Sequence, residues 1–144
     1  MSEAKELINE LLVVIFNRIL AIESEALRIS GVTLSMNEVH VLEAISMVNE
    51  PSMTTIATKL GITVGSLTTS INTLVQKGYV KRNFSPTDRR KVLVSLEAPA
   101  SDVLNKHHHF HEKMIDGIFE DLKIHEDEIL LQSLRRVASY FTKE

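Results

Sequence analysis

Hydrophobic residues recur at helical spacing along most of this chain. From residue 3 to residue 29 they fall at i, i+3, i+4 and i+7, and a second apolar face lies beside the first. Because one small core cannot cover a helix that is apolar on two sides, this segment is expected to need a partner on each side. The same spacing predicts a helix over residues 35–48, a long helix over 101–122, and a final helix from near His125 to about Thr142.

The pattern over residues 52–78 predicts two short helices joined by a tight turn. Ser52 and Thr63 can each cap a helix by accepting a backbone N–H. Gly61 can end the first helix in a left-handed conformation, and Gly78 ends the second. The inward stripe of the second helix comprises Leu67, Ile71, Leu74 and Val75. Two short helices around a glycine turn are typical of a helix-turn-helix.

The outward face of the second helix carries hydroxyls and amides but no carboxylate. A face that only meets solvent more often carries Glu and Lys, whereas short hydroxyls and amides suit base edges and phosphate oxygens. The candidate DNA contacts on this helix are Thr63, Ser66, Thr68, Thr69 and Asn72. The alternative is an uncharged surface helix without a ligand.

A hairpin is predicted after this helix, because apolar residues alternate on both sides of a proline-containing turn. Its tip or return limb carries Arg89 and Arg90. Asp88 is expected to orient one of these arginines. We expect Arg90 to enter a minor groove, where a narrow A·T tract concentrates negative potential, and Arg89 to contact the DNA backbone. Lys77 and Arg82 complete the basic candidates for DNA binding.

Charge is distributed unevenly along the 144 residues. The stretch from 51 to 96, called the basic segment below, has seven basic residues and one acidic residue, a net charge of +6. The rest of the chain has nine basic and 18 acidic residues, which gives −9 and the overall net charge of −3. A basic module inside an acidic chain indicates nucleic-acid binding.

The stretch from residue 60 to residue 96 resembles the winged helix of the MarR family of bacterial transcription regulators. The matching residues are the Gly61 turn, Leu67, Leu74, Gly78, Tyr79-Val80-Lys81-Arg82, Asp88-Arg89-Arg90, Val94 and Leu96. The resemblance covers essentially the whole chain. It implies a mainly α protein with a small β-hairpin wing (α+β class), built as one winged helix-turn-helix chain.

Three regions follow from this resemblance. Residues 35–97 form the winged helix-turn-helix, and residues 1–30 and 101–144 are dimerisation helices. An obligate homodimer built from both ends of the chain also explains their surplus of apolar residues. Packing of these helices within one chain is the alternative.

Composition narrows the function classes. There is no cysteine, so disulfides and thiol catalysis are excluded. The chain has no P-loop, nucleotide-binding glycine fingerprint, nucleophile elbow or metalloprotease His-Glu pair, so we expect no enzyme. No apolar run approaches a membrane span, and the acidic start is unlike a signal peptide. A cytoplasmic protein without a membrane partner is expected.

Histidines crowd one stretch of the predicted long helix. His107 and His111 are four residues apart and share a helix face, a workable spacing for two metal ligands, and His40 could approach them. This arrangement is similar to that of zinc-sensing repressors of the MarR family. The carboxylates that could complete the set are Glu23, Glu25 and Glu38. The alternative is a polar seam between packed helices.

Residues 64–74 and 76–80 are similar to the fatty-acid-synthesis repressors (FabT type) of lactic-acid bacteria. That similarity implies a long-chain acyl group on acyl carrier protein as co-repressor, held in an apolar tunnel between the long helices, and no required cofactor. We favour it over zinc, because the helix-turn-helix matches more closely than the ligand set does. A protein–protein adaptor that binds no DNA is the contrasting function class.

Overall fold

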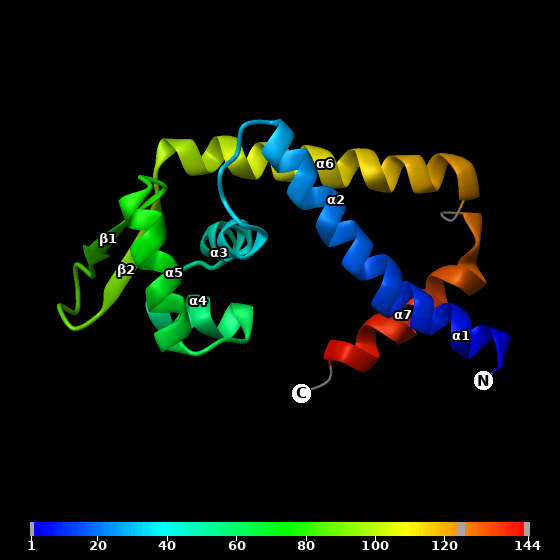
Figure 1. Cartoon of the computed structure of the whole chain (residues 1–144). Helices are drawn as coiled ribbons and strands as arrows, with labels where there is room; N and C mark the ends of the chain where they lie inside the picture. Colours follow the sequence, from blue (N-terminus) through cyan, green and yellow to red (C-terminus); the bar gives the residue numbers. More distant parts are fainter. Residues whose placement is uncertain (1, 124–125, 143–144) are drawn as a thin grey trace. The chain divides into compact units, whose positions relative to one another are not determined.

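The computed structural model describes residues 2–123 and 126–142 of the chain. Figure 1 shows its elements in chain order: α1 (Glu3–Asn9), η1 (Glu10–Ile15), α2 (Phe16–Ile29), α3 (Met36–Met47), α4 (Met53–Leu60), α5 (Val64–Gln76), β1 (Val80–Phe84), β2 (Val92–Leu96), α6 (Ala98–Leu122) and α7 (Glu128–Thr142). The chain divides into two compact units at a point within α6. The first is Met1–His108 and the second is His109–Glu144.

The N-terminal helix is helical over the whole predicted range, but it is not a single α-helix. Its middle six residues, Glu10–Ile15, form the π-helix η1 between α1 and α2. A π turn holds more residues than an α turn, so it rotates the side chains that follow relative to those before. Apolar side chains on all sides of this segment are exposed, among them Leu11 and Val14. Because no single face of this segment is buried, the spacing of its apolar residues gives no sign of the change from α-helix to π-helix.

The three central helices each begin at a hydroxyl cap, and the predicted caps Ser52 and Thr63 are confirmed. The Ser35 hydroxyl accepts the backbone N–H of Glu38 at 3.2 Å, and the Glu38 carboxylate accepts the Ser35 N–H at 3.2 Å. Ser52 forms the same reciprocal arrangement with Thr55 at the start of α4. Gly61 ends α4 with φ +68°, a conformation that only glycine adopts readily. Local chemistry thus sets these helix ends.

The core of the first unit lies among α3, α4, α5, the hairpin and the beginning of α6. Its fully buried side chains are Val39, Leu42, Ile56, Leu67, Ile71, Leu74, Val94 and Ala100. Three of the four residues predicted for the inward stripe of α5 are in this set. The fourth prediction was wrong, because Val75 is 37% exposed. It lies at the edge of the helical stripe, where one further step of about 100° turns a side chain toward solvent.

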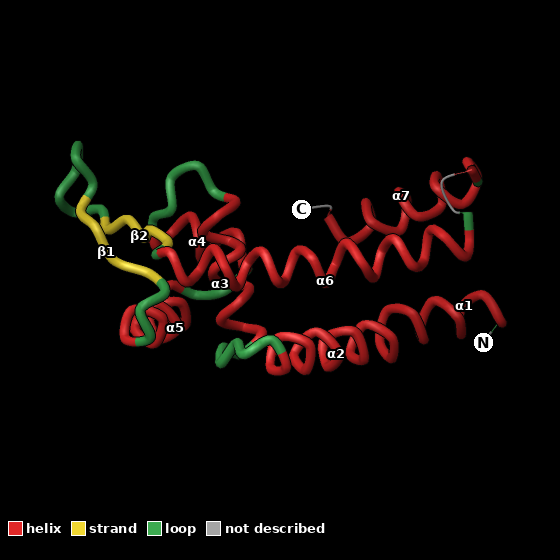
Figure 2. Tube along the Cα trace, turned by 90° about the horizontal axis from the view of Figure 1, so that it is seen from above, coloured by secondary structure: helices red, strands yellow, loops and turns green. Residues whose placement is uncertain are grey.

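The hairpin is antiparallel, and Figure 2 shows its two strands projecting beside α5. Val80 pairs with Leu96 at its base, and Phe84 pairs with Val92 near its tip. The Val94 N–H donates to the carbonyl of Pro51 at 2.8 Å, so the segment before α4 also holds β2. The wing is therefore fixed to the helix-turn-helix by backbone hydrogen bonds.

The last two helices begin at positions that differ from the sequence expectation. α6 starts at Ala98 instead of residue 101, because Pro99 falls in the first turn, where its missing N–H costs nothing. α7 begins at Glu128, and the predicted start near His125 lies outside the described residues. Among the helices of the described residues, none is long and apolar enough to cross a membrane.

Candidate nucleic-acid interface

Helix α5 presents the predicted polar surface on the side opposite the core. Ser66, Thr69 and Asn72 are exposed, while Leu67 and Ile71 one position away are fully buried. The buried side of α5 packs against α3, α4 and β1. Packing on several elements keeps the helix in one orientation and leaves the hydroxyls and the amide toward solvent.

Three of the five candidate contacts at α5, Thr63, Ser66 and Thr68, already have local side-chain hydrogen bonds. Thr63 is the N-cap, and its hydroxyl oxygen accepts the backbone N–H of Ser66 at 3.1 Å. Thr68 is half-buried, and its hydroxyl donates to the carbonyl of Val64 at 2.8 Å. The Thr68 proton is thus committed to the helix itself, although its oxygen can still accept a hydrogen bond.

Lys77, at the C-terminal end of α5, joins the helix to α3. Its Nζ lies 3.0 Å from one carboxylate oxygen of Glu38 and 3.3 Å from the other. Partial burial raises the pKa of the Glu38 carboxyl, but hydrogen bonds from Lys77 and Ser35 outweigh that effect, and the pKa lies below its usual value. Lys77 was predicted to contact DNA. In the structure its ammonium group pairs with α3 and so positions α5, which is called the recognition helix below.

Glu38→Gln is expected to lower the free energy of unfolding by about 0.5–1 kcal/mol at pH 7. Since the pKa of Glu38 in the folded protein lies below the value of 4.5 for the unfolded chain, its carboxylate stabilises the fold above about pH 4.5. That contribution disappears as the pH falls through the folded pKa. Urea unfolding at pH 7 and at a series of pH values below 4.5, at one protein concentration, should show the stability difference between the two proteins narrowing as the pH falls.

The control for this prediction is Glu25→Gln. Glu25 is fully exposed and pairs with Arg28 on the same helix, and the hydrogen bond from Arg28 lowers its pKa. Such exposed pairs contribute little, so we expect no measurable change at any pH. A stability difference between wild type and Glu38→Gln that does not narrow as the pH falls below about 4.5 would contradict the assignment to Glu38 ionisation.

The turn of the wing is ordered by Asp88 through the main chain. The Asp88 carboxylate accepts the backbone N–H of Arg90 at 3.0 Å, and its carbonyl accepts the N–H of Lys91 at 3.1 Å. Lys91 pairs with Glu50 at 3.0 Å. In the part of the chain that the structure describes, neither the Arg89 nor the Arg90 guanidinium has a hydrogen bond or an ion pair. Asp88 thus fixes the backbone and leaves both guanidinium groups available.

Arg82 and Asn72 connect the wing to the recognition helix. The Arg82 side chain, from β1, donates a hydrogen bond to Oδ1 of Asn72 on α5, and both residues are exposed. These two candidates were named separately from the sequence, on different elements, and the structure brings them together. The exposed surface of α5 is therefore joined to β1 of the wing by a side-chain contact within the basic segment.

Comparisons with known proteins agree with this geometry. A model of the MarR family matches residues 30–91. The structure of FabT from Streptococcus pneumoniae in complex with DNA is 30% identical, covers 95% of this chain and 96% of FabT, and superposes with a TM-score of 0.85. The chain belongs to the MarR family of transcription regulators.

Two solved structures of lower identity share the fold. Rv1404 from Mycobacterium tuberculosis is 20% identical, with a TM-score of 0.74 over 100% of this chain and 98% of its own. A MarR variant from E. coli with operator DNA is 20% identical, with a TM-score of 0.71 over 99% and 100% of the two chains. No curated protein sequence matches the chain.

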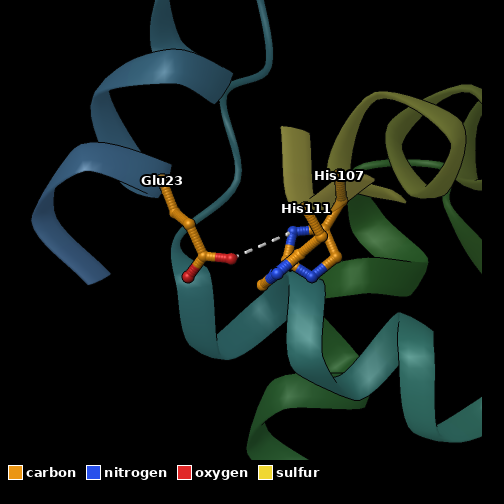
Figure 3. Close-up of side chains that lie close together, drawn as sticks. All are labelled: Glu23, His107 and His111. Atoms are coloured by element: carbon orange, nitrogen blue, oxygen red, sulfur yellow. Dashed lines mark ion pairs between the residues drawn. The ribbon is translucent and has the colours of Figure 1, made fainter. Parts of the chain in front are cut away.

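The first unit of this MarR-family chain also contains a buried polar cluster away from the wing. Figure 3 shows Glu23 of α2 beside His107 of α6, with the carboxylate 3.7 Å from Nδ1 of the imidazole. Each side chain is only 3% exposed. The other ring nitrogen, Nε2, lies 3.4 Å from Glu43 of α3, and the His40 ring centre is 6.3 Å from that of His107.

The structure separates the carboxylates named from the sequence. Glu23 lies beside His107, whereas Glu25 pairs with Arg28 and Glu38 pairs with Lys77. His111 follows His107 by one turn of α6 and falls in the second unit. Glu43 was not predicted, although it lies three residues after His40 and so near it on the helix surface, which was the available signal. The metal site itself stays a prediction.

Proposed function

We propose that this MarR-family regulator is a repressor that binds a specific DNA operator in the cytoplasm. The single observation that carries the proposal is the exposed hydroxyl and amide face of α5 on a basic segment whose Arg89 and Arg90 side chains make no hydrogen bond or ion pair with the described residues. Short polar side chains on a recognition helix suit major-groove base edges, and guanidinium groups suit phosphates and a narrow minor groove. The 30% identity to a protein solved on DNA supports the same conclusion.

The active form we propose is a homodimer. Large apolar side chains are exposed on the N-terminal helices, including Leu7 at 54% and Phe16 at 56%, and on α7, including Ile129 at 81% and Phe141 at 65%. Exposed apolar helix faces of this kind, each within its own unit, indicate an interface with another chain. A two-fold dimer would place two recognition helices about 34–36 Å apart, so the operator should be a pseudo-palindrome.

A footprint on promoter fragments, including the chain's own promoter, tests this proposal. Protection should cover two half-sites about one helical turn apart. Absence of specific protection on every fragment would contradict operator binding. The adaptor alternative makes a different prediction, since a protein partner would bind the Arg89→Ala, Arg90→Ala double variant as well as wild type.

The genes under control are proposed to be those of fatty-acid synthesis, with a long-chain acyl group on acyl carrier protein as co-repressor. The similarity of residues 64–80 to FabT-type repressors supports this effector. The N-terminal helices also carry open apolar grooves, one of which is lined by Ile8, Leu12 and Val13. An acyl chain would bury apolar surface in such a groove, with a gain of about 0.8 kcal/mol for each methylene group.

Zinc is a second candidate effector, and the buried cluster around His107 favours it. Neutral imidazole nitrogens and carboxylate oxygens are usual zinc ligands, and Glu23 and Glu43 face the two nitrogens of that ring. Within the first unit the residues present fit such an ion: one nitrogen of His107 would bind it beside Glu23, the other would donate to Glu43, and His40 would supply a second imidazole. Bound zinc would supply a charge that joins helices, and its affinity should fall as the pH drops through the usual histidine range near 6.5.

One titration separates the two effectors. Operator affinity is measured with zinc, with chelator, and with long-chain acyl carrier protein in the presence of chelator. The acyl proposal predicts tighter binding in the third condition and no effect of chelator alone. Loss of operator binding with chelator, together with no response to acyl carrier protein, would instead assign regulation to zinc.

A further inference from the structure

Asn72 and Arg82 form a polar pair at the exposed junction of α5 and β1. Asn72 lies on the outward face of the recognition helix, and Arg82 pairs with Val94 in the register of the hairpin. The hydrogen bond from the guanidinium to the Asn72 side chain connects the two elements through side chains. Both residues stay exposed, so the pair is accessible to a DNA major groove that α5 enters.

The chemistry of the pair determines which way the amide faces. A guanidinium group carries only donors, whereas a carboxamide has an acceptor oxygen and a donor nitrogen. The atom of Asn72 that meets Arg82 must therefore be Oδ1. Within residues 2–123 and 126–142, the Asn72 Nδ2 group makes no hydrogen bond, and its two N–H donors are available.

This orientation changes what Asn72 can recognise. An asparagine with both atoms available pairs with adenine, because Oδ1 accepts from N6 while Nδ2 donates to N7. Here a base donor that approached Oδ1 would also approach the Arg82 cation, which repels it. The pair offers donors from both residues, and guanine presents two acceptors, N7 and O6, on its major-groove edge.

We propose that Asn72 reads a guanine in each operator half-site, and that Arg82 is the positioning residue that sets this preference. The inference rests on the proposed function, since it assumes operator DNA in contact with α5. A purely structural role of the pair, which would only brace the wing against the helix, predicts no base preference that depends on either residue.

The first test replaces the Nδ2 donor of Asn72 but keeps an oxygen that can accept from Arg82. Asn72→Asp keeps the size of the side chain and can still pair with Arg82, but it presents only acceptors. Binding is measured on operators that carry each of the four bases at every position of a half-site. At one position, the wild type should prefer guanine by about tenfold to a hundredfold, and Asn72→Asp should lose that preference.

The second test removes the hydrogen bond that Arg82 donates to Oδ1 of Asn72. Arg82→Ala should shift the preference at that same position from guanine toward adenine by about tenfold or more. Lys81→Ala is the matched control, because it removes an exposed cation from the neighbouring position of β1 and should leave the preference unchanged. Thermal unfolding of each variant confirms that it is folded.

A wild-type preference for any base other than guanine, at the position that Asn72→Asp affects, would overturn the inference. So would base preferences that Asn72→Asp leaves unchanged at every position. An Arg82→Ala variant that loses affinity equally for operators with all four bases would overturn it as well. Failure of the proposed function is distinguishable, because the wild-type protein would then bind none of the operators specifically.

Discussion

His107→Leu is expected to lower the free energy of unfolding by about 3–5 kcal/mol. The imidazole is 3% exposed and lies between the carboxylates of Glu23 and Glu43, which come from α2 and α3. Its removal would leave the equally buried Glu23 carboxylate beside an apolar side chain, where a charge is poorly solvated. Urea unfolding at one fixed protein concentration measures the loss, since the stability of a dimer depends on concentration.

The double variant Glu23→Leu, His107→Leu is the matched control for this prediction. Replacing both members of a buried pair removes the buried carboxylate together with its imidazole partner, so most of the lost stability should return. A double variant as unstable as His107→Leu alone would show that the two side chains do not act as an energetic pair. The same unfolding experiment with and without chelator tests zinc, because an ion bound only to the folded state would raise wild-type stability.

Arg90→Ala is expected to weaken operator binding by about 1–3 kcal/mol, or roughly fivefold to 150-fold. The Arg90 backbone is fixed by Asp88, and its guanidinium makes no hydrogen bond or ion pair with the described residues. It is therefore ready to enter a minor groove, and the loss should be largest for operators flanked by A·T tracts, whose minor groove is narrow. Fluorescence anisotropy on A·T-flanked and G·C-flanked operators measures the difference.

Arg28→Ala serves as the control for charge. It also removes one exposed guanidinium, but that group already pairs with Glu25 on α2 and lies outside the basic segment. Its effect on operator affinity should be small on both kinds of flanking sequence. An equal loss for Arg90→Ala on A·T-flanked and G·C-flanked operators would indicate contact with phosphates instead of insertion into a minor groove.

Local sequence signals predicted the helix-turn-helix well, because short-range chemistry determines its ends. Ser52 and Thr63 cap α4 and α5, and Gly61 adopts the left-handed conformation between them. The family resemblance extended this local pattern to the wing and to the whole chain. The predicted DNA contacts on the wing stay predictions, since no DNA is part of the structure.

Features that depend on packing between distant elements were not predictable in the same way. The pairing of Asn72 with Arg82 requires β1 to fold against α5, and the pairing of Lys77 with Glu38 requires α5 to lie on α3. Glu43 was missed because a carboxylate on a helix usually meets solvent. The π-helix η1 has no signal in a segment that is apolar on all sides.

The most direct test of the central claim is the salt dependence of operator binding by wild type and by Arg89→Ala. If the basic segment contacts phosphates, the logarithm of the wild-type association constant should fall steeply and linearly with the logarithm of salt concentration. Loss of Arg89 should make that slope shallower by roughly one for each phosphate contact removed. Binding that does not respond to salt, or a slope that Arg89→Ala leaves unchanged, would contradict the account.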